Sequence, residues 1–502
     1  MKRLLGIIMA VALLAGCCGV FAEEQKAPDF ILEGYDGENT YRTWETNLFF
    51  RRMEERTGIS FEFREYTSYT RWKDRKNAIA RKEDLPEVLF KAELGADEVR
   101  DLYEAGVLID LRPYLEENAP NVWKLLQEDP DTLAAVTMPD GAIPALPSFN
   151  SLQNNSLMWI NRTWLKAVKM EAPTTAEELT EVLRAFRDGD PNRNGRKDEV
   201  PLTFIGMWEL RFLGHAFGIT DNDYYVSLED GKVTSALTSD RNRAFLEWLH
   251  MLWEEGLLDH NGFAMADSLR RITDENATIP YGMMMANAPS SVIATKASAN
   301  YALLLPLQWE GKQTYRSLTG NMIRGTFALT VRCKDPARML QWVDYLYTEE
   351  GSLLAMYGLE GQEYSFRDDG MWEWNEDQDT VTNYIVPMNT IRTLGADATA
   401  PGIMPVEFTG KYGDEETRED IQEVIGATEF FRLPIPPYTM TREDQKAVND
   451  IQAELSPYAE TTMARFVTGD IPLDDENWKV FCDTAEEKGL SDMIAIWQKY
   501  AK

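Results

Sequence analysis

The residues best spaced for chemistry form one short polar segment, DGDPNRNGRKDE, at positions 188–199. Aspartate and asparagine alternate there around Gly195, an arrangement that wraps calcium, because this hard cation takes its ligands from oxygen atoms. The candidate ligands are Asp190, Asn192, Asn194, the backbone carbonyl of Arg196, Asp198 and Glu199. We therefore predict a calcium ion with a structural role in this loop.

The loop departs from the usual EF-hand at its end. A bidentate glutamate normally stands at the twelfth position, which is Pro201 here. The shell would therefore close earlier, through Asp198 and Glu199. The competing interpretation is a polar loop whose asparagine and aspartate side chains cap the preceding helix.

Aromatic residues are the second group with a chemical use. The chain has 14 Trp, 20 Tyr and 21 Phe, which make up 11% of it. Flat rings suit stacking on sugar rings because they offer large faces and lose little rotamer entropy. Most of them are expected in the core. Trp208 follows a strand-like segment and precedes a helix, so it is a candidate to face a ligand.

Catalytic templates are missing from the sequence. There is no G-x-S-x-G elbow, no H-E-x-x-H, no P-loop and no G-x-G-x-x-G. The histidines, at 215, 250 and 260, share no zinc-ligand spacing. The 83 acidic residues guarantee accidental carboxylate pairs, so catalysis by two carboxylates stays open. The sequence disfavours an enzyme.

Composition restricts the possible partners. The 51 Lys and Arg against 83 Asp and Glu give a net charge of −32. Such a surface repels phosphate backbones, so we do not expect a nucleic-acid partner. Of the four cysteines, Cys17 and Cys18 lie at the expected processing site, and a bridge between Cys333 and Cys482 stays open.

The N-terminal residues are typical of an export signal. A basic start at 1–3 precedes an apolar run at 4–15, which is too short to span a bilayer. The run ends in Leu-Ala-Gly-Cys, which resembles the lipobox of bacterial lipoproteins. We predict a signal peptide over 1–17, lipidation of Cys17 and a flexible tether over 18–29. The alternative, cleavage after Ala22, also exports the chain but leaves it unanchored.

The elements that must position these residues follow from hydrophobic periodicity. The first part alternates between helix and strand, which favours an α/β sheet with crossover helices. Its expected elements are helices at 46–57, 71–80 and 97–105 and strands at 59–63, 85–90 and 107–111. Helix then dominates, with expected helices at 174–188, 241–255, 336–350, 415–425, 443–466 and 491–500 and strands at 281–286, 301–306 and 326–332.

Several segments occur in an order typical of a known family. They are LPEVLF, GVLIDLRPYLEENAPN, AIPALPS, SLMWINRTWLKAVKMEAPTTAEELTEVLRAF, DPNRNGRKDEVPL, YGLEGQEYSF and SPYAETTMARFVTGDIPLDD. Together they resemble family 1 extracellular solute-binding proteins of ABC sugar importers. The resemblance is to the large lipoprotein branch that includes alginate-binding and LplA-type proteins, and it covers residues 29–501.

This resemblance implies an α/β, two-lobed fold like that of periplasmic binding proteins, with a hinge, a ligand cleft and a helix-rich second lobe. It assigns 30–148 and 302–345 to lobe 1 and 149–301 and 346–502 to lobe 2, which carries the calcium loop. A monomer would capture an oligosaccharide by lobe closure and deliver it to an ABC permease. The protein would be lipid-anchored at the extracellular face of the cell membrane. The alternative is an extracellular lyase or glycosidase.

The resemblance also implies which residues hold the ligand, because loops after strands face the cleft in this family. The candidates are Lys91, Glu93, Ser148, Asn150, Trp208, Asn287, Asn321, Arg324, Glu360 and Tyr364. A purely structural role competes at several of these positions. Ser148 and Asn150 would then only cap turns, and Glu360 would pair with a surface base.

Overall fold

The computed structural model describes residues 27–37, 43–152, 156–317, 320, 322–378, 385–387, 394, 400–412 and 415–501. The expected signal peptide with Cys17, most of the tether and Asn321 lie outside these described residues. Within the described ranges, no helix has the length and apolar character needed to cross a bilayer.

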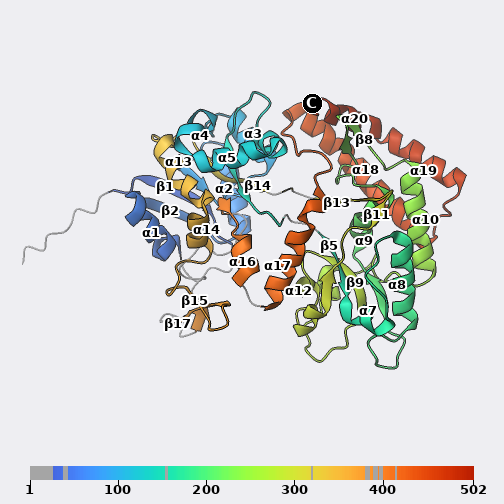
Figure 1. Cartoon of the computed structure of the whole chain (residues 1–502). Coiled ribbons are helices and arrows are strands. Elements are labelled where there is room, and N and C mark those ends of the chain that lie inside the picture. Colours follow the sequence, from blue (N-terminus) through green and yellow to red (C-terminus); the bar gives the residue numbers. More distant parts are fainter. Residues whose placement is uncertain are drawn as a thin grey trace, which may run out of the picture.

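Lobe 1 is built on a six-stranded sheet with strand order β19-β4-β14-β3-β1-β2. Its strands are β1 (Phe30–Tyr35), β2 (Phe61–Tyr66), β3 (Val88–Phe90), β4 (Ala145–Phe149), β14 (Met322–Leu329) and β19 (Gly402–Ile403). Only β14 runs against its neighbours β3 and β4, so the other strands share one direction. Crossover helices α1 (Leu48–Thr57), α2 (Tyr69–Ala80) and α3 (Ala96–Glu104) connect them, as the alternation predicts (Figure 1).

Local sequence signals explain where these helices begin and end. The Asn47 side chain accepts a hydrogen bond from the Phe49 N–H at the start of α1, and Gly58 ends the helix with a φ of 65°. The expected strand at 107–111 forms only an isolated bridge between Leu108 and Thr330. An apolar run alone does not make a strand when the sheet offers no free edge beside it.

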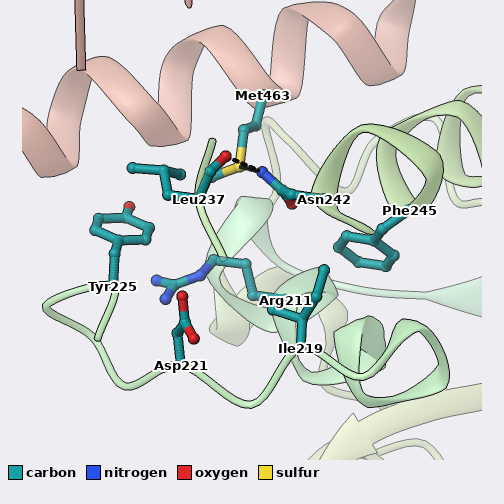
Figure 2. A pocket seen from close by; sticks show the side chains of 8 residues that line it. All are labelled: Arg211, Ile219, Asp221, Tyr225, Leu237, Asn242, Phe245 and Met463. Carbon is teal, nitrogen blue, oxygen red and sulfur yellow. Dashed lines mark hydrogen bonds between the residues drawn. The ribbon is translucent and has the colours of Figure 1, made fainter. Parts of the chain in front are cut away.

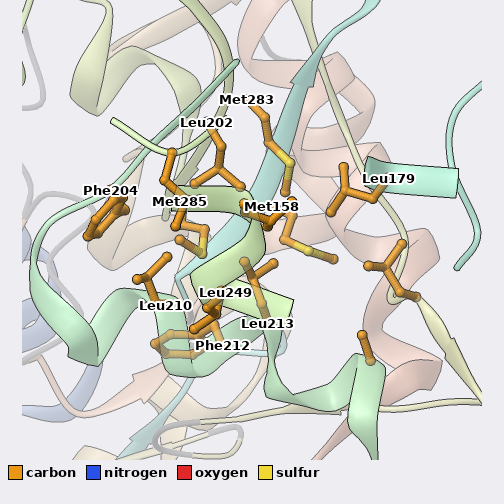
Figure 3. Packing of buried hydrophobic residues seen from close by; sticks show 14 of the residues in the cluster. Met158, Leu179, Leu202, Phe204, Leu210, Phe212, Leu213, Leu249, Met283 and Met285 are labelled. Atoms are coloured by element: carbon orange, nitrogen blue, oxygen red, sulfur yellow. The ribbon is translucent and has the colours of Figure 1, made fainter. Parts of the chain in front are cut away.

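Lobe 2 has a smaller sheet and more helix. Its strand order is β10-β5-β9-β6, with β5 (Leu157–Asn161), β6 (Val200–Thr203), β9 (Tyr281–Ala286) and β10 (Tyr301–Leu303). The long helices α8 (Ala176–Asp188), α10 (Asp240–Glu254) and α18 (Arg442–Thr468) enclose its core. Figure 3 shows methionines of β5 and β9 packed against leucines and phenylalanines of the helices and of the segment after β6.

The remaining helices are α4 (Arg112–Asn118), α5 (Pro120–Glu128), α6 (Pro130–Val136), α7 (Arg162–Val168), α9 (Gly206–Leu210), α11 (Asp267–Arg270), α12 (Pro289–Val292), α13 (Pro336–Asp344), α14 (Glu349–Met356), α16 (Val406–Tyr412), α17 (Glu415–Ala427), α19 (Asp475–Glu487) and α20 (Leu490–Gln498). The remaining strands are β7 (Ser227–Glu229), β8 (Lys232–Thr234), β11 (Gln308–Trp309), β12 (Lys312–Gln313), β13 (Tyr315–Arg316), β15 (Tyr364–Phe366), β16 (Trp372–Trp374), β17 (Glu376–Gln378), β18 (Ile385–Pro387) and β20 (Phe431–Arg432). The helix expected at 336–350 is divided, because Thr348 caps a new helix by accepting from the Gly351 N–H.

The two-lobed α/β fold is confirmed, but two lobe boundaries differ from those expected. Residues 302–317 belong with lobe 2, since β10 joins its sheet and Tyr315 of β13 lies in its core. The described residues within 346–412 pack on lobe 1, since β19 pairs with β4 and α14 is part of the lobe 1 core. The described elements therefore pass between the lobes after β4, before β14 and after α16. Cys333 and Cys482 are both free and pack against different lobes, so they do not form the bridge left open above.

Candidate ligand-binding site and metal loop

The topology places most of the candidate ligand residues at two sheet edges. In lobe 1 the carboxyl ends of β1, β2, β3 and β4 share one edge. In lobe 2 the carboxyl ends of β6 and β9 share an edge with the start of β5, where Leu157 lies opposite Ala286. The link 150–156 joins these two edges, and a chain of that length spans at most about 28 Å. Ligands of open α/β sheets bind at such carboxyl edges.

The lobe 1 edge carries a cluster of three charged groups. Lys91, which follows β3, is 1% exposed, and its ammonium donates to Asp36 Oδ1 at 2.5 Å. Glu65, near the end of β2, accepts from the Trp44 N–H. Burial raises the pKa of Glu65 to about 7, and the negative charge of Asp36 adds to this rise. Lys91 and Glu93 both have left-handed backbone angles, with φ of 50° and 48°.

The β4 candidates have structural roles at the same edge. Ser148 is buried in the strand and lies opposite Gly402 of β19. The Asn150 side chain accepts from the Leu152 N–H at 3.1 Å, which is the turn-capping role weighed above. This cap uses only the side-chain oxygen, so the Asn150 amide group can donate to a ligand hydroxyl. Both residues stay predictions as ligand contacts.

The lobe 2 edge presents an aromatic ring. Trp208 of α9 is 47% exposed and packs edge-on against Phe212, with ring centroids 6.5 Å apart. The next residue, Glu209, is buried and accepts two hydrogen bonds from Arg270, at 2.9 and 3.2 Å, and one from the Ile205 N–H at 2.7 Å. This buried pair fixes the first turn of α9 and thereby the base of Trp208.

Asn287 also belongs to the lobe 2 edge, and the remaining described candidates have different surroundings. Asn287 is exposed after β9, with its side-chain oxygen accepting from the Ala288 N–H. The Arg324 guanidinium donates to the carbonyl of Pro437 at 2.9 Å, and burial lowers its pKa. Glu360 is exposed, whereas Tyr364 is buried in a lobe 1 aromatic cluster.

Sequence reasoning missed three residues at the lobe 1 edge. Asp36 and Glu65 belong to the charged cluster, and Tyr69 at the start of α2 is 48% exposed with its ring edge against Tyr35. The signal for Tyr69 is its place directly after a strand. Asp36 and Glu65 carry no local signal, because their partner lies on a third strand.

The loop at 188–199 folds around its own oxygen atoms. The N–H groups of Asn194 and Gly195 donate to the Asp190 carboxylate, and the Arg196 N–H donates to the Asn194 side-chain oxygen at 2.7 Å. The turn needs a φ of 71° at Gly195, which only glycine adopts freely. Asp198 accepts from the amide groups of Asn192 and Asn194 at about 3 Å. Hydrogen bonds therefore join four of the six predicted ligand residues, Asp190, Asn192, Asn194 and Asp198.

The donor set fits calcium in type, although its carboxylates alone do not form a site. Across the described ranges, no three His, Cys, Asp or Glu groups are placed to hold a metal, so asparagine and backbone oxygens would be needed. One Glu199 oxygen is buried without a hydrogen-bond partner. Burial raises the pKa of Glu199, and the charges of Asp198 and Asp190 raise it further. Such an oxygen suits a cation as its partner.

A buried polar cavity inside lobe 2 is too small to hold a sugar. Figure 2 shows Arg211 and Asp221 side by side in it, with Tyr225 beside them. Its volume of about 20 Å³ is the size of one water molecule. Burial raises the pKa of Asp221 to about 6.

Comparisons with known proteins agree with this fold, although no family model matches the chain. The fructooligosaccharide ABC transporter substrate-binding protein FusA of Streptococcus pneumoniae is 27% identical over 491 residues, covering 90% of this chain and 86% of FusA. The polygalacturonan/rhamnogalacturonan-binding protein YtcQ of Bacillus subtilis is 22% identical over 406 residues, covering 75% of this chain and 76% of YtcQ.

Solved structures share the fold over nearly the whole chain. An extracellular solute-binding protein from Bifidobacterium longum subsp. infantis has a TM-score of 0.77 at 22% identity, covering 95% of this chain and 99% of that one. FusA in complex with kestose has a TM-score of 0.67 at 24% identity, covering 94% and 98%. Over most of its length the chain is thus similar to substrate-binding proteins of ABC transporters, and it shares the two-lobed fold of extracellular solute-binding proteins.

Proposed function

We propose that this protein captures an oligosaccharide between its two lobes and delivers it to an ABC permease. The observation that carries the proposal is the exposed Trp208 ring on one sheet edge, with the polar cluster around Lys91 on the edge to which it is linked. A sugar offers an apolar ring face to the first and hydroxyl groups to the second. A ligand that contacts both lobes stabilises the closed form through its differential affinity.

FusA suggests the first sugars to test, because its name specifies fructooligosaccharides. Isothermal titration with kestose, maltotriose and trigalacturonate should find one that binds, and small-angle scattering should show a smaller radius of gyration in its presence. Failure of every sugar in a wider panel of oligosaccharides to bind would refute the proposal. Release of shorter products from a bound oligosaccharide would instead support a lyase or glycosidase.

A lipid anchor at Cys17 is part of the proposal, as it would keep the receptor near its permease. The lipobox-like ending of the leader supports it. Cys17→Ser should release the protein from membranes into the medium. A wild-type protein recovered wholly from the medium would exclude the anchor.

A structural calcium ion in the 188–199 loop is also proposed. It is supported by the oxygen-rich loop folded around Asp190 and Asn194, by the solved structure of an EF-hand mutant of FusA and by that of the alginate-binding protein AlgQ2 without calcium ion. Chelation should lower the melting temperature, and calcium but not magnesium should restore it. The variant Asp190→Ala should melt at one temperature with or without calcium. If the melting temperature of the wild type does not depend on calcium, the loop is a polar helix cap and not a calcium site.

A further inference from the structure

We propose that a cavity between α5, α14 and α16 of lobe 1 is a subsite for an uncharged sugar ring at one end of the ligand chain. This inference rests on the proposed capture of an oligosaccharide. The cavity has a volume of about 370 Å³. Small-molecule sites start at roughly 300 Å³, so there is room for about one or two sugar rings.

The cavity continues the candidate ligand edge of lobe 1. Phe149 and Ser151, which line it, belong to the end of β4 and the residues that follow, directly after Ser148. Its other side is formed by Met404 and the first turn of α16, just after β19. The Met404 N–H donates to the Phe149 carbonyl at 2.8 Å, which extends the sheet pairing along the cavity. The wall is therefore part of the sheet and is fixed before any ligand arrives.

The cavity also lies next to the junction of the lobes. In Figure 1, α16 stands at the side of lobe 1 that faces α17 of lobe 2. The Gln422 side chain of α17 donates to the Gly410 carbonyl of α16 at 2.7 Å. A ligand that extends from the edge of β4 into this cavity therefore reaches a wall that is bonded to the other lobe.

The chemistry of the lining selects the ligand. Phe149, Met404 and Phe408 provide apolar surface for a ring face, and Ser151, Glu349 and Glu407 provide hydroxyl and carboxylate oxygens. Among the described residues that line the cavity there is no Lys, Arg or His. Carboxylates accept strong hydrogen bonds from sugar hydroxyls and repel a uronate, sulfate or phosphate group. The lining thus favours a neutral sugar over an acidic one.

The test separates the subsite from the overall function. The double variant Glu349→Gln and Glu407→Gln keeps the shape of the cavity and removes both charges. The control is Glu350→Gln, which removes an exposed carboxylate that is paired with Arg56 at 3.3 Å and does not line the cavity. A second variant, Met404→Trp, fills the cavity from its rim. Circular dichroism melting checks that each variant is folded.

Binding of kestose, fructo-nystose, maltotriose and trigalacturonate is measured by isothermal titration. We expect the neutral sugar that binds wild type best to lose about tenfold in affinity in the double variant and at least as much in Met404→Trp, with the control unchanged. Trigalacturonate should bind wild type more weakly than that sugar. Tight wild-type binding that both variants retain would overturn the subsite alone, and tighter binding of trigalacturonate would overturn its preference for neutral rings. Wild type that binds no sugar would overturn the proposed function itself.

Discussion

A buried ion pair in lobe 2 and a buried charged cluster at the edge of lobe 1 are built in different ways. In lobe 2, Glu209 and Arg270 form a matched pair, and each side chain is only 3% exposed. In lobe 1, the single cation Lys91 lies among two carboxylates, Asp36 and Glu65. The Glu209–Arg270 pair is stabilising only while Glu209 is ionised and Arg270 is protonated. The lobe 1 cluster has an acid with a pKa of about 7, so it can gain a proton when its surroundings change.

This difference bears on ligand capture. The Glu209–Arg270 pair beside Trp208 keeps one protonation state. This suits an aromatic platform whose position must be fixed before the ligand arrives. The lobe 1 edge can redistribute charge when ligand hydroxyl groups approach the cluster of Lys91, Asp36 and Glu65, because Glu65 can gain or lose a proton. We therefore expect the lobes to respond differently to mutation and to pH.

Removing the cation should be most damaging in lobe 2. Arg270→Met leaves the buried Glu209 carboxylate without its cation, which costs about 3–5 kcal/mol in the free energy of unfolding. Lys91→Met should cost clearly less, because Glu65 can take up a proton and reduce the remaining negative charge. Urea unfolding followed by tryptophan fluorescence measures both variants. Equal losses would refute the contrast between pair and cluster.

The next prediction concerns pH and lobe 2, where two buried titrations oppose each other. Burial lowers the pKa of His215 to about 4, so its contribution to stability is present above pH 6.5 and is lost as the pH falls. Burial raises the pKa of Asp221 to about 6, so its contribution is present below pH 3.8 and is lost as the pH rises through 6. The two contributions nearly cancel in the wild type.

Asp221→Asn should remove this cancellation. An asparagine oxygen can still accept from the Ala236 N–H, which donates to Asp221 at 2.7 Å. The variant should then lose about 3 kcal/mol of lobe 2 stability between pH 6.5 and 4, because Asp221 no longer opposes the effect of His215. Chemical denaturation at a series of pH values measures this loss. A pH profile parallel to that of wild type would contradict it.

Local signals in the sequence predicted some elements closely. The buried run YGMMMA forms β9 at its expected bounds, and Thr175 caps α8 by accepting from the Glu178 N–H. These signals are local because periodicity and caps act within a few residues. The same signals cannot show which core an element joins. The described residues within 346–412 were therefore assigned to the wrong lobe, since long-range contacts, such as the pairing of β19 with β4, place them.

The residues of the candidate site also differ in whether local sequence predicts their positions. The places of Lys91 and Trp208 in the fold follow from local sequence, because Lys91 directly follows β3 and Trp208 lies in α9, shortly after β6. The cluster of Asp36, Glu65 and Lys91 was not predictable, because it joins three strands that meet only in the folded sheet. The cavity beside α16 likewise depends on the placement of segments far apart in the chain.

The third prediction tests Trp208 as the platform of lobe 2. Trp208→Ala should weaken the binding of the captured sugar by about 10- to 100-fold, or about 1–3 kcal/mol, because a stacking face is lost. Trp208→Phe keeps a smaller ring and should fall in between. The melting temperature should change little, since the side chain is 47% exposed. Unchanged affinity in the alanine variant would remove Trp208 from the site.

The smallest effect is expected from Glu65 in lobe 1. Its raised pKa means that its contribution to stability is present below pH 4.5 and is lost as the pH rises through about 7. The side chain is partly accessible to solvent, so screening reduces the effect to about 1 kcal/mol. Glu65→Gln mimics the protonated acid and should flatten the pH dependence of lobe 1 stability between pH 4.5 and 8. Glu62→Gln, an exposed acid on the same strand, is the control. If both variants keep the wild-type slope, the lobe 1 cluster does not respond to protons and the contrast between the lobes is reduced to the Glu209–Arg270 pair.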